Sequence, residues 1–368
     1  MPSAADIIVS AGDIRCPVIF SRYRRRLAGM IPRETMVAVI SNPTIFALHG
    51  RRLMLEILPA GRKVVPIMMG DGERFKSQST VNALYDHLLD IRFSRHDFLV
   101  VFGGGVVGDT AGYVAATYKR GVALVQCPTT LVAMVDAAIG GKVGINHSRG
   151  KNLIGAFHQP LTVMIDPQWL HTLNRREMVS GFGEILKVGF LASPQVLHQV
   201  ARMDPSVMNP ADQRLHGLIR QAITIKAGIV SDDPYDYGRR AILNFGHTFA
   251  HAIEAAEGYR RFCHGEAVLA GMVGALYLSH AMGKLSPLGL QACLDYLRGF
   301  MLFIPRLSKD AGAYIEPMQT DKKATSRRLR VVLLAGMGRP VISDVDSIRP
   351  LKTAVKRMME FVNSRGSI

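Results

Sequence analysis

The chain has 368 residues, of which 48% are hydrophobic and 20% charged, a composition that excludes a disordered or fibrous protein. Lysine and arginine outnumber aspartate and glutamate by 45 to 29, so the formal net charge is +16, and the excess is spread along the chain. Only 7% of the residues are aromatic, which leaves little material for stacking on single-stranded nucleic acid.

Short apolar runs alternate with helical patterns in the first half of the chain. The runs predict buried strands at 36–40, 63–68, 98–102, 123–126 and 162–165. Helix-like segments lie between them, for example at 79–91 and 110–118. This alternation predicts an α/β domain with a mainly parallel sheet.

After Asn174 the pattern changes to long helical segments. Apolar residues recur at helical spacing in 177–191, 213–230, 248–256, 266–282 and 287–300, and only 330–334 looks like a strand. We therefore predict two domains, 1–174 and 175–368, the second mostly α-helical. The longest apolar stretch, 267–282, contains two glycines, a serine and a histidine, so it predicts a buried helix rather than a membrane span.

The cysteines and the N-terminal residues indicate in which cellular compartment the protein is expected. Cys16, Cys127, Cys263 and Cys293 are far apart and form no CxxC pair, which argues against a disulfide framework. The first residues lack the basic-then-apolar pattern of a signal peptide. We expect a soluble, cytoplasmic protein.

A glycine-rich segment at 103–109 follows a predicted strand and opens a predicted helix. Glycine there lets the backbone approach a phosphate closely, and the N–H groups at a helix start favour an anion. The spacing fits GxGxxG, but the acidic residue expected about twenty positions later is absent. These residues leave two alternatives, a nucleotide site and a tight strand-to-helix turn.

His247 and His251 stand four positions apart on a predicted helix, a spacing that suits a divalent metal. The glutamate of the HExxH motif is absent, and His264 is a candidate third ligand. The alternative is that these histidines are packed or capping residues. Cys263 is either a zinc thiolate or a small buried hydrophobic residue.

Several lysines also have two interpretations. Glu184 and Lys187 form either a helix-surface ion pair or a buried functional pair. Lys142 and Lys151 lie beside glycines in a predicted polar loop, where they either face solvent or bind a phosphate or carboxylate. The charge run at 321–323 predicts a solvated turn.

Together these motifs resemble the 3-dehydroquinate synthase family of sugar phosphate cyclases. The matching stretches, in family order between about residues 70 and 335, are GGGVVGDTAGYVAATYKRG, PTTLVAMVDAAIGGKVGINHSRGKNLIGAFHQP, GFGEILKVG, RRAILNFGHTFAHAIEAAEGY, HGEAV and TDKK. The resemblance implies a Rossmann-like NAD-binding domain followed by a helical domain that binds metal and substrate. It also implies the shikimate-pathway lyase reaction that converts 3-deoxy-D-arabino-heptulosonate 7-phosphate to 3-dehydroquinate and phosphate.

The resemblance implies roles for individual residues as well. The ligands of Zn²⁺ or Co²⁺ are Glu184, His247 and His264. The contacts to NAD are Asn42, Glu73, Lys76, Gly104, Gly105, Val106, Asp109, Thr129, Thr130, Lys142, Lys151, Thr172, Leu173 and Glu177. The catalytic residues are Lys142, Lys187, Lys226, Arg240, Asn244 and His251. The further substrate contacts are Asp136, Asn152 and Lys323, and Arg120, which in a homodimer reaches the neighbouring subunit's phosphate site.

The expected partner is an anionic small molecule that carries a carboxylate and a phosphate, which suits the many basic residues. Sister cyclases of the 2-deoxy-scyllo-inosose synthase type are a rival interpretation, but they lack counterparts of Arg240 and Asn244. Enzymes similar to glycerol dehydrogenase are a second rival and would consume NAD stoichiometrically. A basic nucleic-acid-binding protein is a third, but no helix-turn-helix, zinc-finger or RNP pattern is present. We therefore expect neither a nucleic-acid nor a membrane partner.

Overall fold

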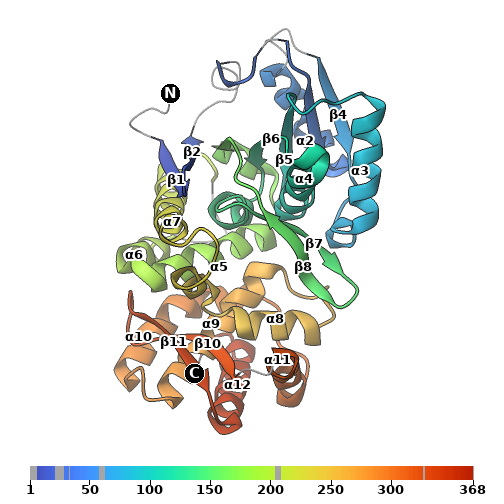
Figure 1. Cartoon of the computed structure of the whole chain (residues 1–368). Coiled ribbons are helices and arrows are strands. Elements are labelled where there is room, and N and C mark those ends of the chain that lie inside the picture. The colour runs from blue at the N-terminus through green and yellow to red at the C-terminus, as the bar shows by residue number, and fades with distance from the viewer. Residues whose placement is uncertain are drawn as a thin grey trace. The chain divides into compact units, whose positions relative to one another are not determined.

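The computed structural model describes residues 6–20, 29–32, 34–57, 63–203, 209–325 and 328–367, apart from the side chains of 320–325 (Figure 1). The chain divides into two compact units. The first contains Met1–Leu173 and Lys226–Tyr235, and the second contains Asn174–Ile225 and Asp236–Ile368. The division of function expected between the two domains stays a prediction.

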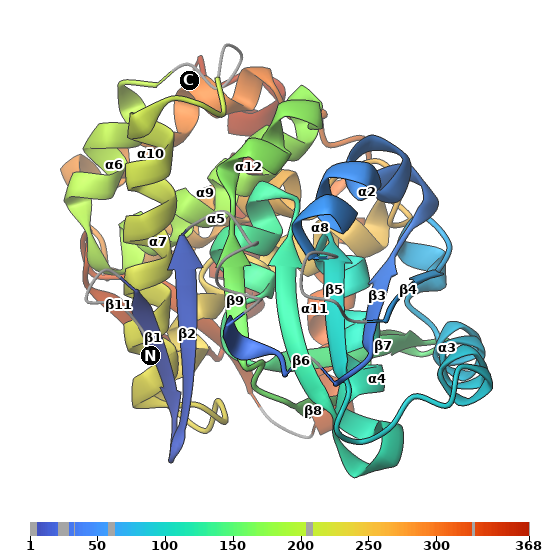
Figure 2. The same cartoon turned by 90° about the horizontal axis from the view of Figure 1, so that it is seen from above.

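A seven-stranded sheet forms the centre of the first unit (Figure 2). Its order is β1 (Ile7–Ala11), β2 (Ile14–Phe20), β9 (Thr162–Ile165), β6 (Ala123–Pro128), β5 (Phe98–Gly103), β3 (Val37–Ser41) and β4 (Val64–Met68). β1 pairs antiparallel with β2, and the other neighbouring pairs are parallel. The mainly parallel sheet is confirmed. β1 and β2 have no counterpart among the predicted strands, since β1 is short and contains Ser10, and Arg15 and Pro17 interrupt the apolar run of β2.

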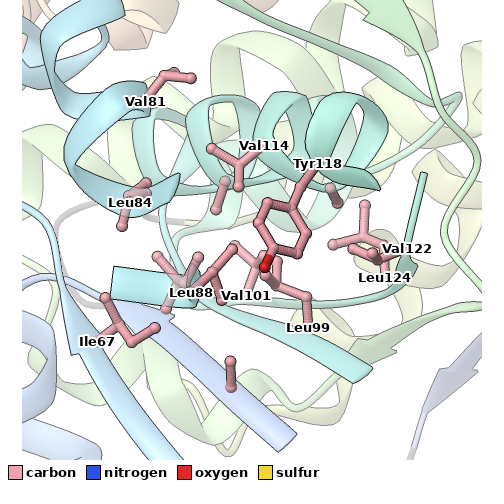
Figure 3. Close-up of a cluster of buried hydrophobic side chains, with 14 of the residues drawn as sticks. Ile67, Val81, Leu84, Leu88, Leu99, Val101, Val114, Tyr118, Val122 and Leu124 are labelled. Carbon is pink, nitrogen blue, oxygen red and sulfur yellow. The ribbon is translucent and has the colours of Figure 1, made fainter. Parts of the chain in front are cut away.

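Helices lie on both faces of this sheet, because successive residues of a strand point to opposite sides. On one face, His49 of α2 (Pro43–Ile57) packs edge-on against Phe102 and Trp169, with ring centroids 6.4 and 5.1 Å away. On the other face, α3 (Gln78–Asp90) and α4 (Gly105–Thr117) form a buried cluster with the strands (Figure 3). That cluster includes Val81, Leu84, Leu88, Leu99, Val101, Val114 and Leu124.

A separate hairpin, β7 (Lys142–His147) and β8 (Gly150–Phe157), occupies the segment expected to be a polar loop. That expectation was wrong. Glycine and lysine are depleted in strands, so composition favours a loop here. The antiparallel ladder is held by backbone hydrogen bonds, which composition does not report.

Helices dominate the second unit, as predicted. They are α5 (Arg175–Ala192), α6 (Pro194–Ala201), the first part of α7 (Gln213–Asp232), α8 (His247–Ala256), α9 (His264–Ala281), α10 (Pro287–Arg298), α11 (Ala311–Thr325) and α12 (Ile348–Asn363). In the described part of both units, the short helical turns are η2 (Glu73–Phe75), η3 (Tyr118–Arg120), η4 (Ala133–Ala137), η5 (Pro167–Thr172), η6 (Arg239–Asn244) and η7 (Gly299–Leu302).

Two expectations for the second unit need correction. The predicted strand at 330–334 is β10 (Leu329–Leu334), but it pairs with a second strand, β11 (Pro340–Val345). β11 begins with a proline and its apolar run is interrupted by Ser343 and Asp344, so it has no continuous apolar run that would predict a strand. The charge run at 321–323 lies in the last turns of α11 rather than in a turn, since lysine is a good helix former near a helix C-terminus.

Helix α9 lies at the centre of the second unit. Of its 18 residues 14 are buried, and it packs against α5, α8, α10, α12 and β10. A helix that is apolar all round must be enclosed by other elements, which confirms the prediction of a buried helix at 267–282. Among the described residues, no helix has the length and apolar character needed to cross a membrane.

The backbone of α9 touches the backbones of its neighbours at glycines. A Cβ atom at Gly265 would lie 1.9 Å from the carbonyl oxygen of Ser180 in α5. A Cβ atom at Gly271 would lie 2.2 Å from the carbonyl oxygen of Gly246, the residue before α8. Any larger residue at these positions would force the helices apart.

We therefore expect Gly265→Ala to lower the free energy of unfolding by about 3 kcal/mol, the upper end of the range typical of overpacking. Gly217→Ala in α7 is the matched control, because no heavy atom lies within 4 Å of its Cβ position. That variant should be neutral or more stable by up to about 1 kcal/mol. Urea unfolding followed by circular dichroism measures both. Equal stability of the two variants would contradict the backbone contact.

Candidate functional site

Three side chains of the second unit bring metal-ligating atoms together. Glu184 of α5, His247 at the start of α8 and His264 at the start of α9 place such atoms within 4.8 Å of one another. Glu184 Oε1 lies 3.8 Å from His247 Nε2 and 3.4 Å from His264 Nε2. One carboxylate and two imidazoles are the donor set of a catalytic zinc site with an open position, so these residues fit zinc.

Local structure at the helix starts orients the two histidines. Gly246 adopts a left-handed conformation with φ of 79° immediately before α8, which turns the chain so that His247 is the first helical residue. The Nδ1 atom of His247 is 3.2 Å from the carbonyl oxygen of Phe245 and donates to it. Its Nε2 atom therefore faces Glu184 as the free ligand nitrogen.

The surroundings of the two imidazoles shift their pKa values in opposite directions. Burial, followed by the nearby Lys187 ammonium, lowers the pKa of His247 to about 3, so this ring is neutral and its lone pair is available. Burial also acts to lower the pKa of His264, but hydrogen bonds with Glu184 and Glu254 outweigh burial and raise that pKa to about 10. A metal ion bound here would displace a proton from His264, because metal and proton compete for the same nitrogen.

The structure decides between the two interpretations of Glu184 and Lys187. Both residues are only 1% exposed, and Lys187 Nζ lies 2.5 Å from Glu184 Oε2. They form a buried pair rather than a surface ion pair, as buried charges require. Since Lys187 contacts Oε2, it leaves Oε1 facing the histidines.

Three further predicted site residues lie on α8 or on the helical turn that precedes it. The His251 ring centroid is 5.6 Å from that of His247 and 6.4 Å from that of His264. Arg240 and Asn244 both belong to η6, which ends three residues before His247. Arg240 is only 3% exposed, so its guanidinium is desolvated.

Cys263 is a helix cap and does not belong to the metal cluster. Its side chain accepts the backbone N–H of Glu266, and the Glu266 carboxylate accepts the N–H of Cys263 at 2.8 Å. Burial, with the nearby carboxylates of Glu266 and Glu177, raises the pKa of the Cys263 thiol to about 12. A thiol that stays protonated is a poor metal ligand.

The sequence patterns missed two groups beside the cluster. Arg176 of α5 binds Glu266 of α9 through two hydrogen bonds of 2.8 and 2.6 Å, and this ties together the helices that carry Glu184 and His264. The sequence signal that could have identified Glu266 is its position three residues after Cys263, which is the spacing of a capping box. Glu254 contacts His264, and its position seven residues after His247 places it on the same face of α8.

In the first unit, residues expected to contact NAD follow the carboxyl ends of parallel strands. They are Asn42 after β3, Glu73 and Lys76 after β4, Gly104, Gly105, Val106 and Asp109 after β5, Thr129 and Thr130 after β6, and Thr172 and Leu173 after β9. Parallel strands end at the same edge of the sheet, so the fold brings these segments to one edge (Figure 2).

The order of the strands indicates where on this edge a ligand binds. From β3 the chain passes to β4 on one side and then returns to form β5 on the other side of β3. Ligands of doubly wound sheets bind at such a reversal, because the two crossover connections leave in opposite directions. Asn42 and Gly104 directly follow these two strands.

A polar cluster also gathers beside the glycine-rich turn. Lys76 Nζ lies 2.5 Å from Asp109 Oδ2 and 2.5 Å from Asn152 Oδ1, and Asn146 donates to Glu73 at 2.7 Å. Burial raises the pKa of Asp109 despite the opposing effect of the Lys76 ammonium. The structure thus joins four predicted residues from separate parts of the sequence, namely Glu73, Lys76, Asp109 and Asn152.

The remaining predicted residues are more dispersed. Lys226 Nζ lies 2.5 Å from Asp136 Oδ1 and 2.7 Å from the Asp136 carbonyl oxygen. Thr172 Oγ1 is 2.8 Å from His49 Nε2, and burial raises the pKa of Glu177. The others in this group are Lys142 and Arg120, which are exposed, Lys151, which is half-buried, and Lys323, whose side chain lies outside the described residues.

Comparison with known proteins gives matches over most of the chain. A family model described as 3-dehydroquinate synthase N-terminal matches residues 66–180, and one described as 3-dehydroquinate synthase C-terminal matches residues 181–324. A curated relative from Geobacter metallireducens, named 3-dehydroquinate synthase, is 42% identical over 303 residues, which cover 82% of this chain and 84% of the relative.

Two solved structures share the fold. A 2-deoxy-scyllo-inosose synthase complexed with carbaglucose-6-phosphate, NAD⁺ and Co²⁺ has a TM-score of 0.84 and 24% identity, and the match covers 98% of this chain and all of that one. A 2-epi-5-epi-valiolone synthase from Streptomyces hygroscopicus with NAD⁺ and Zn²⁺ bound has a TM-score of 0.84 and 24% identity, with 95% and 98% covered. These likenesses confirm the architecture predicted from the sequence.

The metal cluster generates a direct prediction. Removing one imidazole of three ligands should reduce bound zinc in His247→Ala to a small fraction of one ion per chain, as measured by elemental analysis after dialysis. Cys263→Ser is the matched control, because serine still caps the helix and the thiol is outside the cluster. It should keep its zinc. Loss of zinc from Cys263→Ser, or full occupancy in His247→Ala, would show that the ligands are assigned wrongly.

Proposed function

This chain belongs to the 3-dehydroquinate synthase family, and we propose that it converts 3-deoxy-D-arabino-heptulosonate 7-phosphate to 3-dehydroquinate and phosphate. The reaction is that of a phosphorus–oxygen lyase in the shikimate pathway. The observation that carries the proposal is the cluster of Glu184, His247 and His264 with the buried Lys187, found in a chain that matches both family models. Fold alone does not assign an activity, since sister cyclases share it.

We propose NAD and Zn²⁺ or Co²⁺ as the cofactors. Solved structures with this fold hold NAD⁺ together with Co²⁺ or Zn²⁺. Bound metal supplies Lewis acidity at a substrate hydroxyl, and bound NAD supplies a reversible hydride acceptor. In this chain Glu184, His247 and His264 hold the metal. The residues that follow the carboxyl ends of the strands would hold the nucleotide, and the N–H groups at the start of α4 would be available to bind its phosphates.

The substrate is anionic, and basic side chains bind it, of which Arg240, Lys187 and Lys226 are buried and Lys142 is exposed. Arg240 holds the carboxylate, because a desolvated guanidinium makes two parallel hydrogen bonds to that group. Lys187 orients Glu184 and donates to substrate oxygens from the same place. Lys226, paired with Asp136, and Lys142 on β7 are the basic substrate contacts of the first unit. Asn152, Asn244, His251 and Lys323 are the further substrate contacts in this proposal.

We further propose that the enzyme is a cytoplasmic homodimer. Arg120 is exposed and is held in a left-handed conformation, with φ of 67°, at the end of η3. An exposed guanidinium suits a contact with the phosphate of a neighbouring subunit. The four cysteines are free in the structure, which suits a reducing compartment.

The redox role of NAD gives the first test of this function. Phosphate release from the heptulosonate phosphate should require NAD, while absorbance of the reduced nicotinamide stays flat over many turnovers. The reason is that the hydride is returned to the substrate within each cycle. Steady accumulation of NADH would instead indicate a simple dehydrogenase, and phosphate release without NAD would rule out the redox cycle.

Arg240 gives the second test, which separates this enzyme from sister cyclases. Removing one partner of a charge-assisted hydrogen bond in a desolvated site costs about 2–5 kcal/mol, so Arg240→Ala should lower kcat/KM by about 30- to 5,000-fold. Arg240→Lys should recover little of that activity, because lysine lacks the bidentate geometry. NAD and zinc binding should be unchanged in both variants.

The neighbouring Arg239 provides the control for this test. It is exposed and lines a different surface hollow, with Tyr237 and Asp344, so Arg239→Ala should keep the wild-type kcat/KM. The wild type should also turn over glucose 6-phosphate negligibly, because that sugar has no carboxylate. Full activity of Arg240→Ala, or efficient turnover of glucose 6-phosphate, would overturn the substrate assignment and leave the family unchanged.

A further inference from the structure

A second buried carboxylate lies beside the metal cluster. Glu254 of α8 is 4% exposed, and its Oε1 atom lies 3.5 Å from Nδ1 of His264. The other ring nitrogen, Nε2, lies 3.4 Å from Glu184 Oε1. The imidazole of His264 is therefore placed between two carboxylates, one at each nitrogen.

The two histidines are held in the same way but by different acceptors. His247 turns its Nδ1 to the carbonyl oxygen of Phe245 and its Nε2 to Glu184. His264 turns its Nδ1 to the Glu254 carboxylate and its Nε2 to Glu184. Each ring thus presents Nε2 to the common centre, and its Nδ1–H is held by the protein. A metal-ligating histidine characteristically has this second hydrogen bond, which sets the tautomer and the ring orientation.

Exposure explains why His264 needs the stronger anchor. The side chain of His247 is 11% exposed, so packing restricts its ring. The side chain of His264 is 38% exposed, and packing restricts its ring much less. A polar contact must supply the orientation that packing does not. A negatively charged carboxylate also attracts the N–H of an imidazole more strongly than a neutral carbonyl does.

The helices bring Glu254 to this position. It follows His247 by seven residues, two turns of α8, and so lies on the same face of that helix. Helix α8 packs against α9, whose first residue is His264. One helix thus carries one metal ligand and the anchor of the next ligand.

We propose that Glu254 is a positioning residue of the metal site. It accepts the Nδ1 proton of His264, keeps the lone pair on Nε2 directed at the metal, and makes that nitrogen more basic. Glu254 is not itself a ligand, since the atoms that converge belong to Glu184, His247 and His264. The inference rests on the proposed function in one respect, namely that the cluster binds zinc.

The test compares zinc affinity in three variants, measured by competition with a chelating dye. Glu254→Ala should bind zinc about 10- to 100-fold more weakly than the wild type. Glu254→Gln should weaken binding by less than about tenfold, because an amide oxygen still accepts the Nδ1 proton. In the cobalt-loaded proteins, the visible absorption bands of Glu254→Ala should shift, while those of Glu254→Gln should stay near the wild-type positions.

Glu257, the residue that follows α8, is the matched control, because its carboxylate is engaged by a different set of partners. It accepts hydrogen bonds from the Ser308 N–H at 2.9 Å and from Tyr314 Oη at 2.6 Å. Glu257→Ala should lower the melting temperature but keep wild-type zinc affinity. The comparison separates a positioning role from a general loss of stability.

Three results would overturn the inference. Wild-type zinc affinity in Glu254→Ala would show that the anchor is not needed. An equal weakening in Glu257→Ala would show that stability, and not orientation, controls binding. A wild-type chain that binds no zinc would refute the metal assignment of the proposed function and this inference with it, and that result is distinguishable from the other two.

Discussion

Backbone contact between α9 and its neighbours α5 and α8 holds the metal cluster together. Each ligand directly adjoins a glycine at such a contact, in the pairs Gly183–Glu184, Gly246–His247 and His264–Gly265. Cβ atoms at Gly183 and Gly265 would lie 2.4 and 1.9 Å from carbonyl oxygens of the facing helix. Because these helices meet without intervening side chains, three ligand atoms from distant parts of the chain lie within 4.8 Å of one another.

Each of the three clustered side chains also has a polar or charged partner outside the cluster. Glu184 and His247 are buried and His264 is partly exposed, and each of the three side chains has a partner on the atom that faces away from the centre of the cluster. Lys187 holds Oε2 of Glu184, the carbonyl of Phe245 holds Nδ1 of His247, and a carboxylate holds Nδ1 of His264. These partners direct the remaining atoms inward. The Arg176–Glu266 pair adds a second tie between α5 and α9, at the end of α9 that carries His264.

In the proposed function, the two units contribute different kinds of site. In the first, the site is formed mainly by backbone, because the carboxyl ends of the parallel strands place a glycine-rich turn and several polar loops at one edge of the sheet. In the second, side chains of three helices converge on one point. Proteins with the same fold but 24% identity are named 2-deoxy-scyllo-inosose synthase and 2-epi-5-epi-valiolone synthase, so fold alone does not assign the activity. In the proposed function, discrimination among them depends on individual residues such as Arg240.

The sequence by itself determined the parts of this protein that depend on local periodicity and on motif order. Apolar runs predicted five parallel strands, helical spacing predicted the main helices of the second unit, and six motifs in sequence order identified the family. Only the tertiary structure decided the β7–β8 hairpin, the burial of the Glu184–Lys187 pair, the capping role of Cys263 and the contact of Glu254 with His264. The physical reason is that burial, ion pairing and ligand orientation depend on which side chains meet in space, and the ligands from α5, α8 and α9 meet here only after those helices have packed.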